Sequence, residues 1–478
     1  MNLADDPALR RIDVFAYRHC VSELMTRPLV TVEPERTLSE AAHLMTSRGV
    51  SSLVIADQDG RPVGIITERD LTRAVAAVNL AAKVGSLASA PVATVGSDEF
   101  AHVAIARLDR LGYRHLVVVA GDGRAVGMVT MRSLLHRRVS AALVLGDEIE
   151  AAKEPSDLAG VWAKMPALAS GLRGEDLEAP AIAAVISAVA RGLTRKASEL
   201  AVAEMTKAHG SSPARFAVLV LGSGGRGESL LAADQDNAIV HEGAQDHDSW
   251  FAELGRRLAD ILDGAGIPYC KGGVMAREAS WRHSLEGWQA VVGRWAASAS
   301  PKDLLSADIF FDFRAAFGDL DLADRLRERA LTQAAASPML IRHLSADLAS
   351  VRAPVGLFGQ FKADAGRIDL KLNGLFPVVA GVRALALGRR ISATSTFERI
   401  ARLVEGGDLP GADGLRLKEA MTVFLTLILD QQTQDAVAGN APGTRVEVAR
   451  LDPAERRRLK QAFGDVETFA LAAAGRAP

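Results

Sequence analysis

Two aspartates, Asp234 and Asp236, stand two positions apart just before the apolar segment 238–240. In an extended chain, residues at i and i+2 point to the same side, so these carboxylates would lie next to each other. Like charges held this close are costly unless something compensates them. Carboxylate oxygen is the ligand that Mg²⁺ prefers, and we therefore predict a divalent metal site here.

A glycine-rich segment, GSGGRGE, begins directly after the apolar run 216–221. The run is rich in valine and leucine and free of charge, which predicts a buried strand. Backbone N–H groups of such a turn at the start of a helix suit phosphate, and an arginine adds a fixed positive fork. We predict that the segment binds the triphosphate of a nucleoside triphosphate through Gly222, Ser223, Gly224 and Arg226.

The order of these features, GS followed by DxD entering a strand, resembles the nucleotidyltransferase superfamily with its polymerase-beta-like fold. The longer pattern GSGGRGE…DQDNAIV resembles the DUF294-type nucleotidyltransferases, which are related to PII-protein uridylyltransferases. The resemblance implies two Mg²⁺ ions and an NTP substrate, with Asp234 and Asp236 as metal ligands. It also implies a third carboxylate on a later strand, for which Asp312 in IFFDFR fits best and Asp308 is the substitute.

Two other interpretations of the glycine-rich segment stay open. Its glycines match the dinucleotide fingerprint GxGxxG after a strand, with Glu242 about 20 residues further on. That fold needs a full helix between its strands, however, and the stretch between Gly227 and Asp234 has room for less than two turns. The second interpretation is a structural turn without chemistry.

Residues 21–140 contain an internal repeat, because identical residues recur 63 positions apart without a gap. Each copy is typical of an extended segment, a helix, two strands around a DGR turn and a final helix. The repeat resembles a tandem CBS pair and carries its G-h-x-T-x-x-D pattern at 64–70. The matching pairs include Pro28 with Pro91, Thr31 with Thr94, Gly49 with Gly112, Gly64 with Gly127 and Thr67 with Thr130.

The CBS resemblance implies that the threonine and aspartate of this pattern hold the ribose and phosphate of a regulatory adenine nucleotide. The first copy keeps both, as Thr67 and Asp70, whereas the second keeps Thr130 but has Ser133 in place of the aspartate. A carboxylate that accepts from ribose hydroxyls forms a strong, charge-assisted bond. The alternative is a dimerisation module without ligand, and in either case we expect a homodimer through the CBS pair.

Residues outside these motifs complete the predicted cleft. The segment 366–377 resembles the helical substrate-binding domain of the same nucleotidyltransferases, which implies that Asp369 and Lys371 face the cleft. Lys271, beside two glycines that let a backbone approach a ligand, is a candidate for phosphate contact. The alternatives are a salt bridge between Asp369 and Lys371 and a solvated Lys271.

Length and composition limit the possible classes. The chain has 478 residues and a net charge of −2, which argues against a strongly basic nucleic-acid-binding surface. Two cysteines without CxxC spacing suit a reducing cytoplasm, and neither a signal peptide nor a membrane-spanning run is expected. The predicted parts are an N-terminal segment 1–20, a tandem CBS pair 21–140, a helical connector 141–210, a nucleotidyltransferase core 211–325 and a helical substrate-binding domain 326–478.

These observations favour an α/β multidomain protein: a CBS pair, a polymerase-beta-like core with a mixed sheet and helices, and a C-terminal helical bundle. The leading hypothesis is a magnesium-dependent nucleotidyltransferase, regulated by adenine nucleotide, with a protein or small-molecule hydroxyl as acceptor. A regulatory protein as acceptor is implied only by the family likeness. The alternative is a non-catalytic signalling adaptor that binds nucleotide, because Ala233 stands where many active relatives carry serine or threonine.

Overall fold

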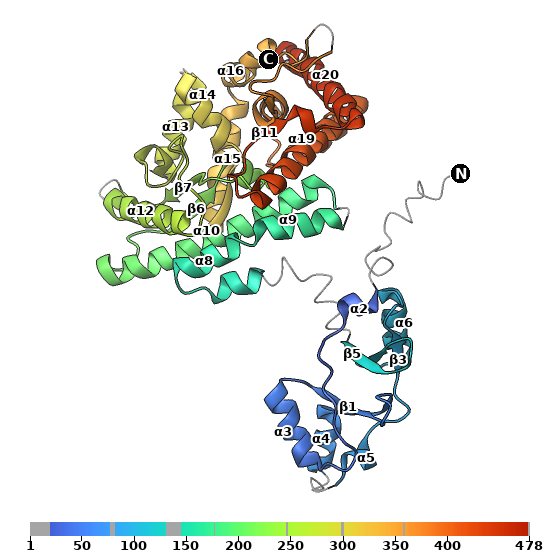
Figure 1. The fold of residues 1–478 in the computed structure, drawn as a ribbon. Helices are drawn as coiled ribbons and strands as arrows, with labels where there is room; N and C mark the ends of the chain where they lie inside the picture. The colour runs from blue at the N-terminus through green and yellow to red at the C-terminus, as the bar shows by residue number, and fades with distance from the viewer. Residues whose placement is uncertain are drawn as a thin grey trace. The chain divides into compact units, whose positions relative to one another are not determined.

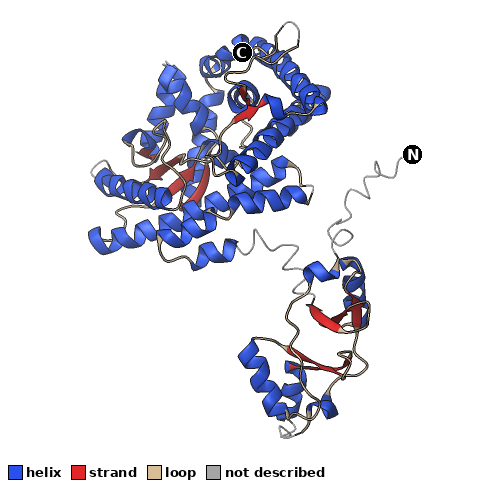
Figure 2. Ribbon diagram, in the orientation of Figure 1, coloured by secondary structure: helices blue, strands red, loops and turns tan. Residues whose placement is uncertain are grey.

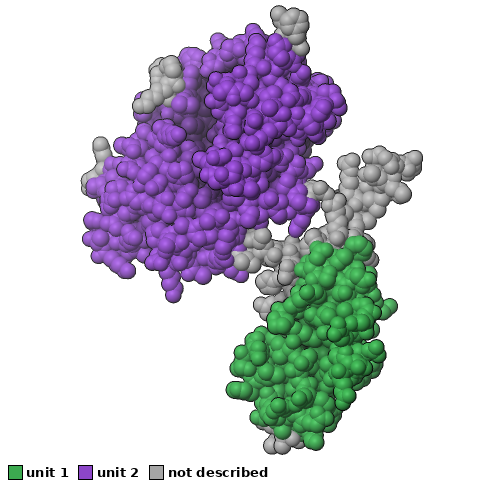
Figure 3. Space-filling view, in the orientation of Figure 1, with its two compact units in different colours: residues 1–143 green, residues 144–478 purple. Residues whose placement is uncertain are grey.

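The computed structural model divides the chain into two units, Met1–Leu143 and Val144–Pro478 (Figures 1 and 3). It describes residues 20–76, 82–130, 145–175, 177–244, 247–297, 301–356 and 359–476. The predicted N-terminal segment, apart from its last residue, and Ser133 lie outside these ranges. In the described part, no helix combines the length and apolar character needed to cross a bilayer.

Unit 1 consists of two copies of one small α/β arrangement, as the internal repeat predicts. Each copy pairs two antiparallel strands and places a helix before them. The first copy contains α2 (Val21–Leu24), α3 (Leu38–Arg48), β1 (Ser52–Ala56), β2 (Pro62–Thr67) and α4 (Glu68–Ala76). The second contains α5 (Val84–Leu87), β3 (Thr94–Gly96), α6 (Ala101–Leu111), β4 (His115–Val119) and β5 (Ala125–Thr130).

The duplication extends to backbone irregularities. The β1–β2 register shifts between Ile55 and Ala56, and the β4–β5 register shifts between Val118 and Val119, 63 positions later. The glycines that end α3 and precede β4, Gly49 and Gly112, both have φ of 63°. Such left-handed backbone favours glycine, which explains why the repeat keeps it.

The centre of unit 2 is a four-stranded mixed sheet in the order β8-β7-β6-β9. The central strand β6 (Phe216–Val220) is antiparallel to both β7 (Asn237–His241) and β9 (Arg314–Gly318), and β8 (Arg282–Ser284) lies parallel to β7. Figure 2 shows these short strands enclosed by helices. Strands buried on both faces read as continuous apolar runs, which is why β6 carried no alternating pattern.

Alternate residues of β6 point into two separate cores. Phe216 and Val218 pack with α10 (Ala179–His209) and α12 (Asp248–Gly264). Ala217 and Leu219 pack on the opposite face, with α13 (Leu285–Ala297) and α15 (Leu320–Ala335). The sheet is therefore held rigidly between helices, and its ends can position side chains accurately.

The rest of unit 2 is helical, as predicted for the C-terminal part. Further elements are α8 (Pro155–Trp162), α9 (Met165–Gly174), α11 (Gly222–Arg226), η4 (Ala279–Trp281), α14 (Pro301–Phe310), α16 (Pro338–Ala346), η5 (Asp347–Ser350), α17 (Phe376–Gly388), α18 (Thr396–Glu405), α19 (Gly411–Val437), η7 (Val448–Arg450) and α20 (Pro453–Arg476). β10 (Arg367–Asp369) and β11 (Arg445–Glu447) are distant in sequence and pair antiparallel in a separate two-stranded sheet. A π-helical turn, η6 (Lys371–Leu375), follows β10.

Candidate active site

The two aspartates of the DxD motif lie at the start of β7, directly beside the glycine-rich segment. Gln235 between them is buried, and its Nε2 donates to the carbonyls of Ala259 and Ile267, both at 2.9 Å. Its backbone also donates to Pro268. Because the residue between them points inward, Asp234 and Asp236 are turned to the opposite side, as expected for an extended chain.

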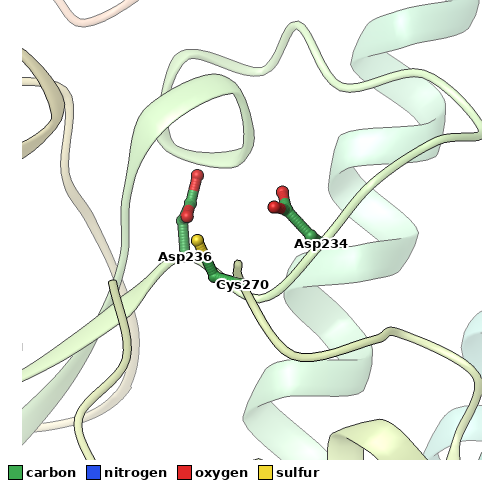
Figure 4. A group of neighbouring side chains, drawn as sticks. All are labelled: Asp234, Asp236 and Cys270. Carbon is green, nitrogen blue, oxygen red and sulfur yellow. The ribbon is translucent and has the colours of Figure 1, made fainter. Parts of the chain in front are cut away.

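Asp234, Asp236 and Cys270 bring their ligand atoms to within 4.8 Å of one another. Figure 4 shows the carboxylate of Asp234 directed toward Asp236, with the Cys270 sulfur beside Asp236. Burial and the neighbouring Asp234 raise the pKa of Asp236 to about 6, and burial and Asp236 raise the pKa of the Cys270 thiol to about 12. The group therefore favours a bound proton or cation, and its two carboxylates suit a divalent metal.

The glycine-rich segment packs so closely on this group that side chains would not fit. Gly222 has a left-handed φ of 54°, and a Cβ there would lie 2.7 Å from Asp236 Oδ2. A Cβ at Gly225 would lie 1.9 Å from the carbonyl oxygen of Asp312. Only glycine therefore fits at positions 222 and 225, because neighbouring atoms occupy the space that a Cβ would need.

The start of α11 presents free backbone donors. Among the described residues, no acceptor is recorded for the N–H groups of Ser223 and Gly224, as expected in the first turn of a helix. The Ser223 hydroxyl lies 3.0 Å from the Ser229 hydroxyl. These donors next to the carboxylates fit the predicted phosphate contact, and Gly222 shapes the turn that presents them.

Arg226, predicted to contact phosphate, is instead engaged by carboxylates. Its guanidinium donates to Glu228 and to Asp312, each at 2.7 Å, and is mostly buried. Glu228 in turn accepts from the Thr396 backbone N–H at 2.6 Å and ties α11 to α18. Arg226 therefore stabilises the glycine-rich loop and the C-terminal helices, although it also lines the cavity described below.

Asp312, predicted as the third metal ligand on a strand, lies in the turn between α14 and β9 and is completely buried. Its carboxylate accepts from Arg226 at 2.7 Å, from Arg383 at 2.7 Å and from Arg399 at 2.6 Å. Burial alone would raise the pKa of Asp312, but the three guanidinium groups outweigh it and lower that pKa. The structure places this carboxylate in an arginine cluster and not in the group of possible metal ligands.

Asp308, the substitute candidate, lies on α14 and faces the same cavity as Asp236. It is paired with Arg383, and burial raises its pKa. Asp308 thus lines the same cavity as Asp236, but its carboxylate already has a cationic partner.

A cavity of about 250 Å³ opens between the sheet and the C-terminal helices of unit 2. Its polar edge includes the glycine-rich loop and one aspartate of the DxD motif, and its other walls are largely apolar. The polar lining residues include Gly222, Ser223, Arg226, Asp236, Asp308, Lys371 and Arg383. The apolar walls include Leu305, Ile309, Leu375, Phe376, Val379, Met421, Leu425 and Ile428.

The structure separates the predicted cleft residues. Lys371 begins the π-helical turn η6, lines the cavity and forms no ion pair within the described residues. Asp369 accepts from the Leu372 backbone and the Thr444 hydroxyl, each at 3.0 Å, and so holds η6 in place. Lys271 is exposed and lines none of the described cavities.

In unit 1, Thr67 and Asp70 bind each other. The Thr67 hydroxyl and backbone N–H donate to Asp70 Oδ2 at 2.7 and 3.0 Å, across the start of α4. Thr130 occupies the corresponding end of β5. The pair is therefore preorganised at the end of the strand that the CBS pattern marks.

Sequence reasoning missed the role of Cys270 and of the arginine cluster. Gln235 pairs with Tyr269 in a parallel bridge, which brings Cys270 beside Asp236. That pairing joins segments about 34 positions apart and has no signal in the residue pattern, which indicated the neighbouring Lys271 instead. Arg383 lies in the almost wholly apolar helix α17 and Arg399 in the amphipathic helix α18, and neither pattern indicates a buried carboxylate partner.

Comparison with known proteins accounts for most of the chain. Residues 163–302 match the family described as "Putative nucleotidyltransferase DUF294", and residues 338–476 match "Putative nucleotidyltransferase substrate binding domain". Residues 21–77 and 84–140 match the CBS domain.

Individual relatives match only part of the chain. An uncharacterized 17.7 kDa protein of Acidianus ambivalens is 33% identical over 114 residues, covering 24% of this chain and 70% of that protein. An uncharacterized protein of Methanopyrus kandleri is 31% identical over 137 residues, covering 28% of this chain and 70% of that protein. A solved CBS domain protein from Pyrobaculum aerophilum, complexed with AMP, is 34% identical to this chain. The match covers 25% of this chain and 94% of that protein, with a TM-score of 0.24. The chain belongs to the CBS-domain-containing proteins of the DUF294 nucleotidyltransferase family.

Proposed function

We propose that this chain transfers a nucleotidyl group from a nucleoside triphosphate to an acceptor hydroxyl, with a divalent cation held by Asp234 and Asp236. The observation that carries the proposal is that both carboxylates line one small cavity together with Ser223 and Gly224, whose N–H groups have no acceptor among the described residues. Mg²⁺ typically binds through one or two carboxylates plus substrate phosphates, which suits this donor set.

The chain's own residues would bind and orient the substrate. The N–H groups of Ser223 and Gly224 donate to triphosphate oxygens, and Lys371, which also lines the larger cavity, adds positive charge. The apolar walls exclude water and accept the nucleoside or a small acceptor. A bound magnesium ion would neutralise the triphosphate and the pyrophosphate leaving group.

Asp312 affects how many cations we propose. The family resemblance implied two ions that share a third carboxylate, whereas Asp312 is neutralised by arginines. We therefore propose one cation between Asp234 and Asp236, with Asp308 as a further acidic group that lines the cavity.

The acceptor and the regulator follow from the family likeness. We propose a hydroxyl of a regulatory protein or a small molecule as acceptor. We also propose that an adenine nucleotide binds the CBS pair near Thr67 and Asp70 and regulates the transfer. The preorganised Thr67–Asp70 bond supports this, because a fixed carboxylate loses little entropy on accepting ribose hydroxyls.

The test is incubation of the full chain with Mg²⁺, each labelled NTP and a cell lysate, followed by detection of the labelled product and of pyrophosphate. Asp236→Asn should reduce transfer at least about 100-fold, since oriented charge stabilisation supplies several kcal/mol. Asp263→Asn, an exposed aspartate on α12, is the matched control and should not change it. Undiminished transfer in Asp236→Asn would contradict the metal role.

A non-catalytic adaptor is the second candidate. One observation favours it: Asp312, the expected third carboxylate, accepts hydrogen bonds from arginines and is not among the possible metal ligands. An adaptor would bind ATP in an Asp236-dependent manner without releasing pyrophosphate in any lysate. Labelled product with wild-type protein would eliminate it.

A further inference from the structure

Cys270 lies where a third metal ligand would be needed. The parallel bridge between Gln235 and Tyr269 sets the two segments side by side, so that the thiol meets Asp236 (Figure 4). Its sulfur lies within 4.8 Å of a carboxylate oxygen of both Asp234 and Asp236. The mechanism proposed above gives this sulfur atom no role.

A second observation indicates a polar occupant in the small cavity that Asp234 and Asp236 line. Gln235 Oε1 is buried without a hydrogen-bond partner among the described residues, while Nε2 is fixed by two carbonyls. Gln235 lines a small cavity of about 30 Å³ together with Asp234 and Asp236. An unsatisfied buried acceptor is costly, and a water molecule in that cavity would satisfy it.

The donor set differs from that of an ordinary magnesium site. Mg²⁺ takes oxygen ligands, whereas thiolate binds borderline and soft cations such as Zn²⁺ and Co²⁺. Two carboxylates, one thiolate and a fourth open position match the three-ligand pattern of zinc sites that keep a water or substrate. A thiolate ligand would therefore change which cation the site prefers.

We propose that Cys270 is a third protein ligand of this site and that the site takes a thiophilic divalent cation of the Zn²⁺ or Co²⁺ class in competition with Mg²⁺. On binding, the S–H bond breaks, a sulfur–metal bond forms, and the proton leaves to solvent. The inference rests on the proposed function only in using Asp234 and Asp236 as metal ligands.

Only a small closure is needed to form the site. Ligand atoms of a tetrahedral centre with bonds of 2.0–2.3 Å are about 3.5 Å apart, compared with the 4.8 Å limit here. Asp234 is exposed and free to change rotamer. Cys270 is half-buried and precedes Gly272 and Gly273, of which Gly273 has a φ of 69°, so its loop can follow.

The chain provides its own control, because Cys20 is the second cysteine, is also half-buried and belongs to unit 1. The experiment is a Co²⁺ titration of the full chain, followed by the near-ultraviolet sulfur-to-cobalt absorption band. We expect a band that saturates at about one Co²⁺ per chain in wild type and in Cys20→Ser, and no band in Cys270→Ser or Cys270→Ala. A band that persists without Cys270, or no band in wild type, would overturn the proposal.

A competition titration with a chromophoric chelator gives the affinities for Zn²⁺ and Mg²⁺. In Cys270→Ser, the ratio of Zn²⁺ to Mg²⁺ affinity should fall at least about tenfold, because supporting groups alone change metal affinity 10–100-fold. An unchanged ratio would count against a sulfur ligand. The result is independent of catalysis: transfer with Mg²⁺ but no cobalt band rejects this inference alone, and a band without transfer rejects only the proposed reaction.

Discussion

Asp312→Asn separates a structural role of this carboxylate from a catalytic one. The variant keeps the size of the side chain but removes the charge that Arg226, Arg383 and Arg399 share. All three guanidinium groups are mostly or fully buried, with exposed side-chain fractions of 12%, 3% and 2%. Breaking one partner of a buried ion pair costs about 3–5 kcal/mol, because the remaining charges lose their compensation.

That loss is a large part of the stability of an ordinary domain, about 5–15 kcal/mol. Unit 2 spans Val144–Pro478, and about 2.1 cal/mol/K of unfolding entropy per residue gives about 0.7 kcal/mol/K for it. The midpoint of thermal unfolding should therefore fall by about 4–7 °C. Removing one guanidinium as well, in Asp312→Asn with Arg399→Gln, should recover part of the loss, because the charges are coupled.

The assay is thermal unfolding of the full chain followed by circular dichroism and by labelled-NTP turnover. Glu405→Gln is the control, because Glu405 pairs with Arg402 at 3.2 Å on the surface, and such a pair contributes at most about 1 kcal/mol. Asp236→Asn should abolish transfer without lowering the unfolding midpoint, since it relieves repulsion with Asp234. An Asp312→Asn protein that unfolds like wild type but has lost transfer would refute this assignment.

Three further predictions test other parts of the molecule. Gly222→Ala should lose transfer at least about tenfold more than Gly227→Ala, because both glycines have left-handed φ, which costs about 1–2 kcal/mol, but only the Gly222 Cβ would strike the Asp236 carboxylate. Burial lowers the pKa of His241 to about 4, below its unfolded value of about 6.5, so its stabilising contribution is complete above pH 6.5 and is lost as pH falls toward 4. Replacing His241 by phenylalanine should remove about 2 kcal/mol of this acid sensitivity, measured as the difference in the free energy of urea unfolding between pH 7 and pH 5. Asp70→Asn should weaken AMP binding to the full chain at least about tenfold in calorimetry, and unchanged affinity would favour a CBS pair without this ligand contact.

The fold class followed from local patterns because those patterns have local causes. The 63-residue repeat predicted two equal copies, and even the register shift at Ile55 recurs at Val118. The uncharged run before Gly222 predicted a buried strand, and the structure buries both of its faces. The spacing of Asp234 and Asp236 predicted adjacent carboxylates because the period of an extended chain is two.

The partners of Asp312 could not be predicted in the same way. Its arginines come from α11, α17 and α18, and no periodicity in one helix indicates what a distant turn presents to it. The pattern around Asp312 also read as a strand, although α14 extends to Phe310 and β9 begins at Arg314. Tertiary packing decided both the conformation and the role of this residue.

The arginine cluster has a consequence for how the cavity is built. Arg383 binds Asp312 and also Asp308, which lines the cavity, while Arg226 connects Asp312 to Glu228 and thereby to Thr396 on α18. The C-terminal helices are thus attached to the glycine-rich loop by charged contacts and not by apolar packing alone. Ion pairs have stricter geometry than apolar contacts, so a shift of these helices would move the loop and the cavity wall together. We expect substitutions in this cluster to change the KM for NTP as well as stability, whereas equally destabilising substitutions in the apolar core should leave that KM unchanged.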